Sequence, residues 1–155
     1  MKSNFVRLLI LSVFMFSASC NMPHEVKISE INTECKQLSD FNLKTGEGFS
    51  HVIIEGYLVG ANKPSDGSPN GPTTEINISD TPDNIKNSVW VSFTVGTENN
   101  QLFEFIDNNN FTVKTSTGDF ARVKDKIRLL VALAKHRTGR DSFHCSLIGS
   151  RVDKL

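Results

Sequence analysis

Three runs of alternating apolar and polar residues constrain the fold of this chain more than any other feature. The runs cover residues 51–60, 74–79 and 87–96, and loops rich in Gly, Pro, Asn and Asp separate them. Successive side chains of a β-strand point to opposite faces, so this alternation predicts strands that are buried on one face. The chain is therefore expected to be mainly β.

The second half of the chain continues this pattern with two less regular segments. Residues 97–109 place Leu102, Phe105 and Ile106 at helical spacing after Thr97, which predicts one short helix. Residues 120–136 fit either a strand or a helix. The loop Arg137–Asp141 and the alternation that follows it favour a closing β-hairpin.

The order of these elements is three strands, one short helix and two strands. With Gly56 inside the first strand and Gly118-Asp119 ahead of the fourth, it resembles the OB-fold. The resemblance covers residues 50–155 and implies a five-stranded Greek-key barrel with one short helix between strands three and four. Gly56 is expected to mark a bulge or a sharp coil of the strand. A β-sandwich, or a mixed α+β domain with a helix at 120–136, is the alternative.

The N-terminus has the layout of a secretory signal peptide. Two cations precede the apolar run Leu8–Phe16, and the small residues 17–19 lead directly to Cys20. The run is about half as long as a membrane-spanning helix requires. The stretch resembles a bacterial lipoprotein signal, which implies cleavage before Cys20 and lipidation, including palmitate, of that cysteine. Ser17 stands where a Leu is usual, so plain signal-peptidase cleavage is the alternative.

This interpretation divides the chain into three parts. Residues 1–19 are the cleaved signal peptide, 20–49 a tether and N-terminal segment, and 50–155 the barrel domain. Asn21, rather than Asp, follows Cys20. By resemblance to enterobacterial lipoproteins, this predicts a bacterial envelope protein held by its lipid in the outer membrane.

The two other cysteines are Cys35 and Cys145. An exported chain is in a compartment where disulfides persist, so the two can form a bond that closes a loop of about 110 residues. They can equally be two separate thiols, with Cys145 a small buried residue.

Charge is distributed unevenly along the chain. Residues 20–120 contain 6 Lys and Arg against 14 Asp and Glu, a balance of −8, whereas residues 121–155 contain 9 against 3, a balance of +6. A basic segment of this kind can meet an acidic partner, or it can face the acidic loops of its own chain.

The OB-fold resemblance implies a binding face on strands two and three, framed by the loops 61–73 and 137–141. The single Tyr and the single Trp of the chain are expected to point outward there and to offer a stacking platform. The candidate ligand-binding residues on or beside this face are Tyr57, Glu75, Asn77, Trp90, Ser92, Thr94, Arg128, Arg137 and Arg140.

No catalytic motif or metal-ligand spacing is found, and His144 and Cys145 should point to opposite faces of a strand. We therefore expect a protein that is not an enzyme and needs no cofactor. The sequence predicts a lipid-anchored binding or adaptor module for a protein, peptide or glycan. An accessory lipoprotein without a ligand pocket is the alternative, and binding of single-stranded nucleic acid is a further, less favoured one.

Overall fold

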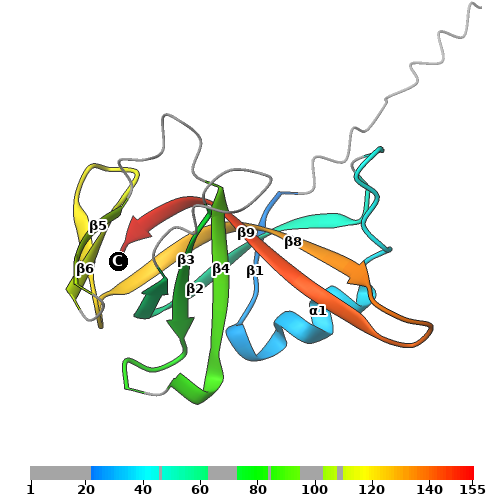
Figure 1. Ribbon diagram of the computed structural model, residues 1–155, viewed down its shortest axis with the longest axis horizontal. Helices are drawn as coiled ribbons and strands as arrows, with labels where there is room; N and C mark the ends of the chain where they lie inside the picture. The colour runs from blue at the N-terminus through cyan, green and yellow to red at the C-terminus, as the bar shows by residue number, and fades with distance from the viewer. Residues whose placement is uncertain (1–21, 46, 63–72, 84, 95–102, 108–109) are drawn as a thin grey trace, which may run out of the picture.

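The structure is a computed structural model that describes residues 22–45, 47–62, 73–83, 85–94, 103–107 and 110–155 (Figure 1). Cys20 and most of the loop 61–73 therefore lie outside the described residues. The described elements are β1 (His24–Glu25), η1 (Ile28–Glu30), α1 (Ile31–Gln37), β2 (Phe49–Asn62), β3 (Thr73–Ser79), η2 (Ile85–Asn87), β4 (Ser88–Thr94), β5 (Phe103–Asp107), β6 (Asn110–Lys114), β7 (Phe120–Arg122), β8 (Lys126–Arg137) and β9 (Phe143–Lys154).

Five strands close into a ring in the order β2, β3, β4, β9, β8 and back to β2. Neighbours in the ring are antiparallel except β4 and β9, which run parallel and share the register pair Ser92–Ile148. β8 pairs with β2 on one side and β9 on the other, so β3 and β4 lie across the ring from it. The prediction of a mainly β chain is confirmed.

The core fills the inside of this ring. Alternate residues of the strands point inward, as the alternation predicts, and ten of the largest fully buried side chains come from four of the five ring strands: Val52, Ile54, Leu58, Ile76, Ile78, Val91, Ile127, Leu129, Val131 and Leu133. Val113 of β6 is fully buried as well. Phe93 completes the interior by packing its ring against Gly149 of β9, where any side chain would overlap it. Residues 126–137 are thus a strand, which settles the ambiguity of 120–136.

The N-terminal segment packs on the barrel from residue 24 onward. β1 pairs with β2, and the buried Ile28, Ile31 and Cys35 then bring η1 and α1 against the barrel. Gly56 makes room for this segment, since a Cβ there would stand 2.8 Å from Cδ1 of Ile28. The expected bulge at Gly56 is wrong: the register of β2 shifts between Leu58 and Gly60.

The helix expected over 97–109 is also wrong for the residues that the structure describes. Residues 103–107 form β5, which pairs with β6, and β6 pairs with β7, so a three-stranded sheet replaces that helix. A short helix is marginally stable by itself, whereas Phe103 and Phe105 here find register partners in Val113 and Phe111. The fold is therefore larger than a plain five-stranded barrel. Gly118, with a φ of 90°, supplies the expected turn, between β6 and β7.

Candidate ligand-binding surface

The outer face of β3 and β4 gathers four of the residues expected to bind a ligand. Asn77 is opposite Trp90 in the register, and Glu75 is opposite Ser92. These residues point outward because their neighbours Ile76, Ile78, Val91 and Phe93 are buried inside the ring. Thr94 belongs to the same strand, but its side chain lies outside the described residues.

Trp90 lies flat across this face. Its Cη2 atom is 3.9 Å from the point where a Cβ of Gly60 would stand, so the indole reaches from β4 over β3 to β2. Asn77 of β3 lies beneath it and is 5% exposed, whereas Trp90 itself is 43% exposed. One face of a large aromatic ring is therefore turned to solvent, and the missing side chain of Gly60 lets it lie there.

Asn77 carries a polar atom that the fold does not satisfy. No described residue donates a hydrogen bond to its buried Oδ1 atom. A buried acceptor without a partner costs about 1–3 kcal/mol and calls for an explanation, as do the hydroxyl oxygens of Thr74 and Thr112. The Asn77 oxygen belongs to the residue opposite Trp90 and is closed to solvent in this arrangement.

Glu75 completes the surface with a small polar network. It accepts hydrogen bonds from Oγ of Ser92 at 3.2 Å and from Nδ2 of Asn62 at 3.1 Å. These contacts hold the carboxylate on the outer face beside Trp90. The surface thus combines an aromatic plane, a buried amide oxygen and an oriented carboxylate, and we call Trp90, Asn77 and Glu75 the Trp90 surface.

The other predicted residues are not all brought to this place. Tyr57 is half-buried on β2 and pairs with Ser79, on the far side of β3 from Trp90. Arg128 lies on β8 and contacts Glu55. Arg137 and Arg140 lie nine or more residues beyond Arg128, so about 30 Å of strand separates them from it. Arg137 is opposite Phe143, which lines one depression together with Trp90. The three arginines therefore do not form a single cluster beside both aromatics.

A groove next to Trp90 was not predicted from the sequence. It has a volume of about 420 Å³ and lies between α1, β4 and β9, which diverge beyond the pair Ser92–Ile148. Its lining includes Ile31, Asn32, Val89, Trp90, His144 and Leu147. The sequence does contain a sign of this groove. Val26, Ile28 and Ile31 are apolar, which indicates that the residues ahead of the barrel pack on it and can form one wall of the groove.

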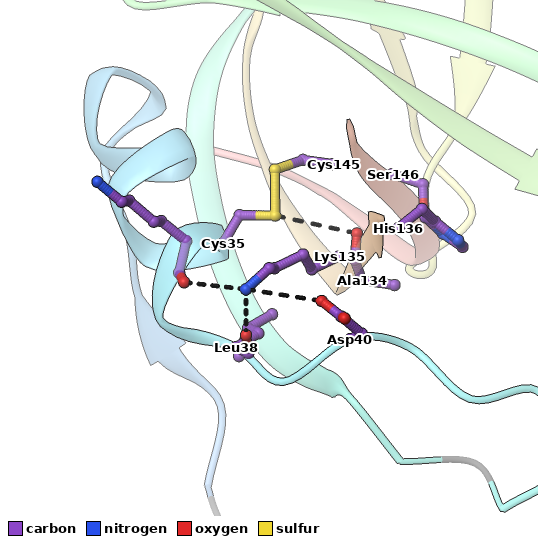
Figure 2. Close-up of a disulfide and its surroundings, with 9 residues drawn as sticks. Cys35, Leu38, Asp40, Ala134, Lys135, His136, Cys145 and Ser146 are labelled. Carbon is purple, nitrogen blue, oxygen red and sulfur yellow. Dashed lines mark hydrogen bonds and ion pairs between the residues drawn. A yellow bond between two sulfur atoms is a disulfide. The ribbon is translucent and has the colours of Figure 1, made fainter. Parts of the chain in front are cut away.

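A disulfide and a lysine hold α1 in this position (Figure 2). Cys35 of α1 and Cys145 of β9 are bonded, with 6.3 Å between their Cα atoms. Lys135 donates from Nζ to the carbonyl oxygens of Lys36 at 3.2 Å and Leu38 at 2.7 Å, which caps the C-terminal end of α1. Asp40, just beyond, pairs with Arg137, whose hydrogen bond holds the pKa of that carboxyl below its usual value.

The basic C-terminal segment is neutralised by the chain's own carboxylates. Seven of its nine Lys and Arg residues lie within 4.0 Å of an Asp or Glu oxygen: Lys124, Lys126, Arg128, Lys135, Arg137, Arg151 and Lys154. The hydrogen bonds from Arg128 and then Lys126 hold the pKa of Glu55 below its usual value. Five of these seven cations pair with carboxylates of residues 20–120, namely Asp40, Glu55 and Asp83, and the other two pair within the basic segment itself.

Comparison with known proteins adds one distant structural likeness. No protein-family model and no curated protein matches the chain. Among solved structures, the chain is similar to the mitochondrial single-stranded DNA binding protein Rim1 of S. cerevisiae, with a TM-score of 0.42 and 14% identity over 69% of this chain and 94% of that one. A likeness of this degree does not indicate what the present chain binds.

Two further observations concern the described residues. None of their helices has both the length and the apolar character that crossing a membrane requires. No three of their His, Cys, Asp or Glu side chains are grouped so that they could hold a metal ion.

Proposed function

We propose that this chain is a lipid-anchored, non-catalytic binding module of the bacterial envelope that holds an uncharged oligosaccharide on the Trp90 surface. The anchoring rests on the signal-like N-terminus that ends at Cys20. The ligand rests on the chemistry of the surface itself.

We further propose that the barrel is of the OB type. The order of the strands in the ring supports this. If the five ring strands are numbered along the chain, β2 is the first, β3 the second, β4 the third, β8 the fourth and β9 the fifth. The fifth strand then lies between the third and the fourth. OB-folds bind oligonucleotides and oligosaccharides on the face that here corresponds to β3 and β4. Trp90 lies on that face.

The observation that favours a sugar is the half-exposed Trp90 ring above the unsatisfied Oδ1 of Asn77. A sugar ring has an apolar face of C–H groups, which packs on an indole, and a rim of hydroxyl groups. A hydroxyl beside Trp90 would donate to the Glu75 carboxylate, and a small shift of the Trp90 ring on binding would open the Asn77 oxygen to a second hydroxyl. In the free protein the unpaired Asn77 oxygen costs free energy, and a bound ligand would remove this cost by donating a hydrogen bond to it.

Single-stranded nucleic acid is the alternative that the OB-type barrel keeps open. Its phosphates require unpaired cations along the binding face, and its affinity falls steeply with salt. The Trp90 surface instead carries the Glu75 carboxylate, and seven of the nine C-terminal cations are paired within the chain. These charges favour an uncharged ligand over a polyanion. The remaining alternative, an accessory lipoprotein without a ligand, leaves the Asn77 oxygen without a role.

The test is a calorimetric screen of the purified chain against neutral oligosaccharides, single-stranded DNA and extended peptides. We expect an oligosaccharide to bind with an affinity that does not change between low and physiological salt. Trp90→Ala should weaken this binding by at least about tenfold, the effect usual for a central aromatic contact. Phe49→Ala is the matched control, because Phe49 is also an outward aromatic with 43% exposure but lies on β2.

Three results would decide against parts of the proposal. Salt-dependent binding of single-stranded DNA without sugar binding would show that the ligand is a nucleic acid and not a sugar. Equal losses of binding affinity for Trp90→Ala and Phe49→Ala would show that the ligand does not bind at the Trp90 surface. For the anchor, the mass of the chain recovered from bacterial membranes should show cleavage before Cys20 and an added lipid, and a cleaved chain without lipid would disprove it.

A further inference from the structure

The outer face of β2 and β8 carries apolar residues where a solvated strand would carry polar ones. Phe49 is opposite Ala134, His51 is opposite Ala132, and Ile53 is opposite Leu130. Ala132 in turn is opposite Ile148 of β9. Strands that face water on one side usually place polar residues there. We call Phe49, Ile53, Leu130, Ala132 and Ile148 the apolar face.

The side chains of this face are accessible to different degrees. Phe49 is 43% and Ile148 44% exposed, and the other three are half-buried. The face is bordered by Arg128 and Arg151, but both are paired, with Glu55 and Asp153 respectively. The exposed His51 lies between Phe49 and Ile53 on this face, and Arg128, Arg151 and Asp153 share the depression beside Leu130, so the face is mainly apolar with paired charges at its edge.

The chain enters the fold beside the apolar face (Figure 1). β1 runs parallel to β2 with His24 opposite Val52, and Pro23 lies with Ile53 and Leu130 around a depression of about 300 Å³. Met22, just before it, is 83% exposed. Cys20 precedes Met22 by two residues, which span at most about 7 Å of extended chain. A lipid on Cys20 would therefore hold the bilayer within a short distance of these residues.

We propose that the apolar face docks on the surface of the lipid bilayer, an inference that rests on the lipid anchor at Cys20 proposed above. An apolar surface with exposed aromatic and aliphatic side chains inserts shallowly among lipid headgroups. Because β3 and β4 lie across the ring from β8, docking through β8 and the first half of β2 leaves Trp90 off the membrane, while Ile148, opposite Ser92, marks the border between the two surfaces. The lipid and the apolar face together thus present the ligand-binding surface to the aqueous space.

A second face lies equally close to the N-terminus but has the wrong charge. It surrounds a depression of about 320 Å³ whose charged lining is Glu25, Lys27, Glu30, Glu55 and Asp80. Four carboxylates against one lysine would be repelled by anionic headgroups. The apolar face has no such excess, so the two faces make opposite predictions about which side chains meet the lipid.

The single Trp of this chain makes the orientation measurable. The lipidated full chain, expressed with its own signal and verified by mass, is placed in vesicles of phosphatidylethanolamine and phosphatidylglycerol, with or without brominated acyl chains that quench tryptophan on contact. Three proteins are compared: the natural chain, Trp90→Phe/Phe49→Trp and Trp90→Phe/Lys27→Trp. The first exchange preserves the composition and moves the reporter between two sites of equal exposure, 43% each.

We expect the Phe49→Trp protein to lose at least about half of its fluorescence in brominated vesicles, since docked side chains reach the boundary between headgroups and acyl chains. The natural chain and the Lys27→Trp protein should keep most of theirs, at all salt concentrations. Should the Phe49→Trp protein not fold, Trp90→Phe/Leu130→Trp reports on the same face.

The inference is overturned if Trp90 of the natural chain, or the reporter at position 27, is quenched more strongly than the reporter on the apolar face. A cleaved chain whose mass shows no lipid overturns the anchor and the docking together. If the quenching pattern holds but no sugar binds, the docking stands and the proposed ligand fails.

Discussion

Removal of the Cys35–Cys145 disulfide should destabilise this protein more than any other small change we predict. The bond links residues 110 positions apart, and it joins α1 to β9 across the end of the barrel. Without it the unfolded chain gains the freedom of an open loop of that length. In the chain-entropy model this gain is about 4.7 kcal/mol at 25 °C. A domain of this size is usually stable by about 5–15 kcal/mol, so the loss is a large fraction of the total.

The perturbation is the double change Cys35→Ala/Cys145→Ala, measured by urea unfolding. With a urea dependence of about 2 kcal/mol per molar, the midpoint should fall by about 2 M. The urea dependence itself should increase, because the unfolded chain without the crosslink exposes more surface. The natural chain with its disulfide reduced is the matched control, since it has the same loop opened without a change of side chain.

A loss below about 1 kcal/mol in both proteins would refute the reasoning, because it would mean that the crosslink hardly restricts the unfolded chain. A large loss in the double variant with no loss on reduction would place the effect in side-chain packing at Cys35, which is fully buried. Both results can be told apart from the expected one by the same unfolding curves.

Three further predictions follow from individual contacts. Gly149→Ala should cost about 1–3 kcal/mol in unfolding free energy, because the added Cβ overlaps the Phe93 ring, and an unchanged midpoint in urea would contradict this packing. Asn77→Val should stabilise the fold by about 1 kcal/mol in the same assay, since it removes an unsatisfied buried oxygen, while it weakens sugar binding; destabilisation would show that the oxygen has a partner. The folded state lowers the pKa of Glu55, chiefly through Arg128, and the pKa of Asp40, chiefly through Arg137. Each carboxylate therefore stabilises the fold fully above its unfolded pKa, 4.5 for Glu55 and 3.8 for Asp40, and this contribution is lost as pH falls below that value. Glu55→Gln should therefore flatten the decline of unfolding free energy below about pH 5, and an identical pH profile would argue against the Arg128 contact.

The strands of the ring could be predicted because each of them is buried on one face only. Alternation marks such a strand directly, and it placed Trp90 outside and Val91 and Phe93 inside the barrel, where the structure has them. The hairpin of β8 and β9 was recognisable from its loop at 137–141. Helix propensity alone favours a helix at 126–136. The alternating segment that follows the loop 137–141 favours a strand there instead, because the two segments together predict a hairpin.

The helix expected over 97–109 was mispredicted, and the packing of the N-terminal segment was not anticipated, for a common physical reason. Both are short, and a short segment takes its structure from whatever it packs against. Residues 24–37 contain few apolar side chains, but these few close the end of the barrel and are held by Cys35 and Lys135. Residues 103–107 have helical spacing, yet β6 offers a pairing partner.

The candidate site was predicted in part. Trp90, Asn77 and Glu75 share a face because alternation and register bring them together. Arg137 and Arg140 do not share that face with them. The sequence shows that these residues are basic, but it does not show how far along β8 they lie from the binding face. The unsatisfied oxygen of Asn77 and the reach of Trp90 to Gly60 depend on side-chain positions that periodicity does not specify.

The most direct test of the central claim uses the fluorescence of Trp90 itself, because the chain contains one Trp. Titration with a neutral oligosaccharide that binds in the calorimeter should change the intensity and shift the emission to shorter wavelength, with the same saturation curve as the heat. Emission that stays unchanged while the sugar binds would show that the ligand lies elsewhere, and would contradict the assignment of the Trp90 surface.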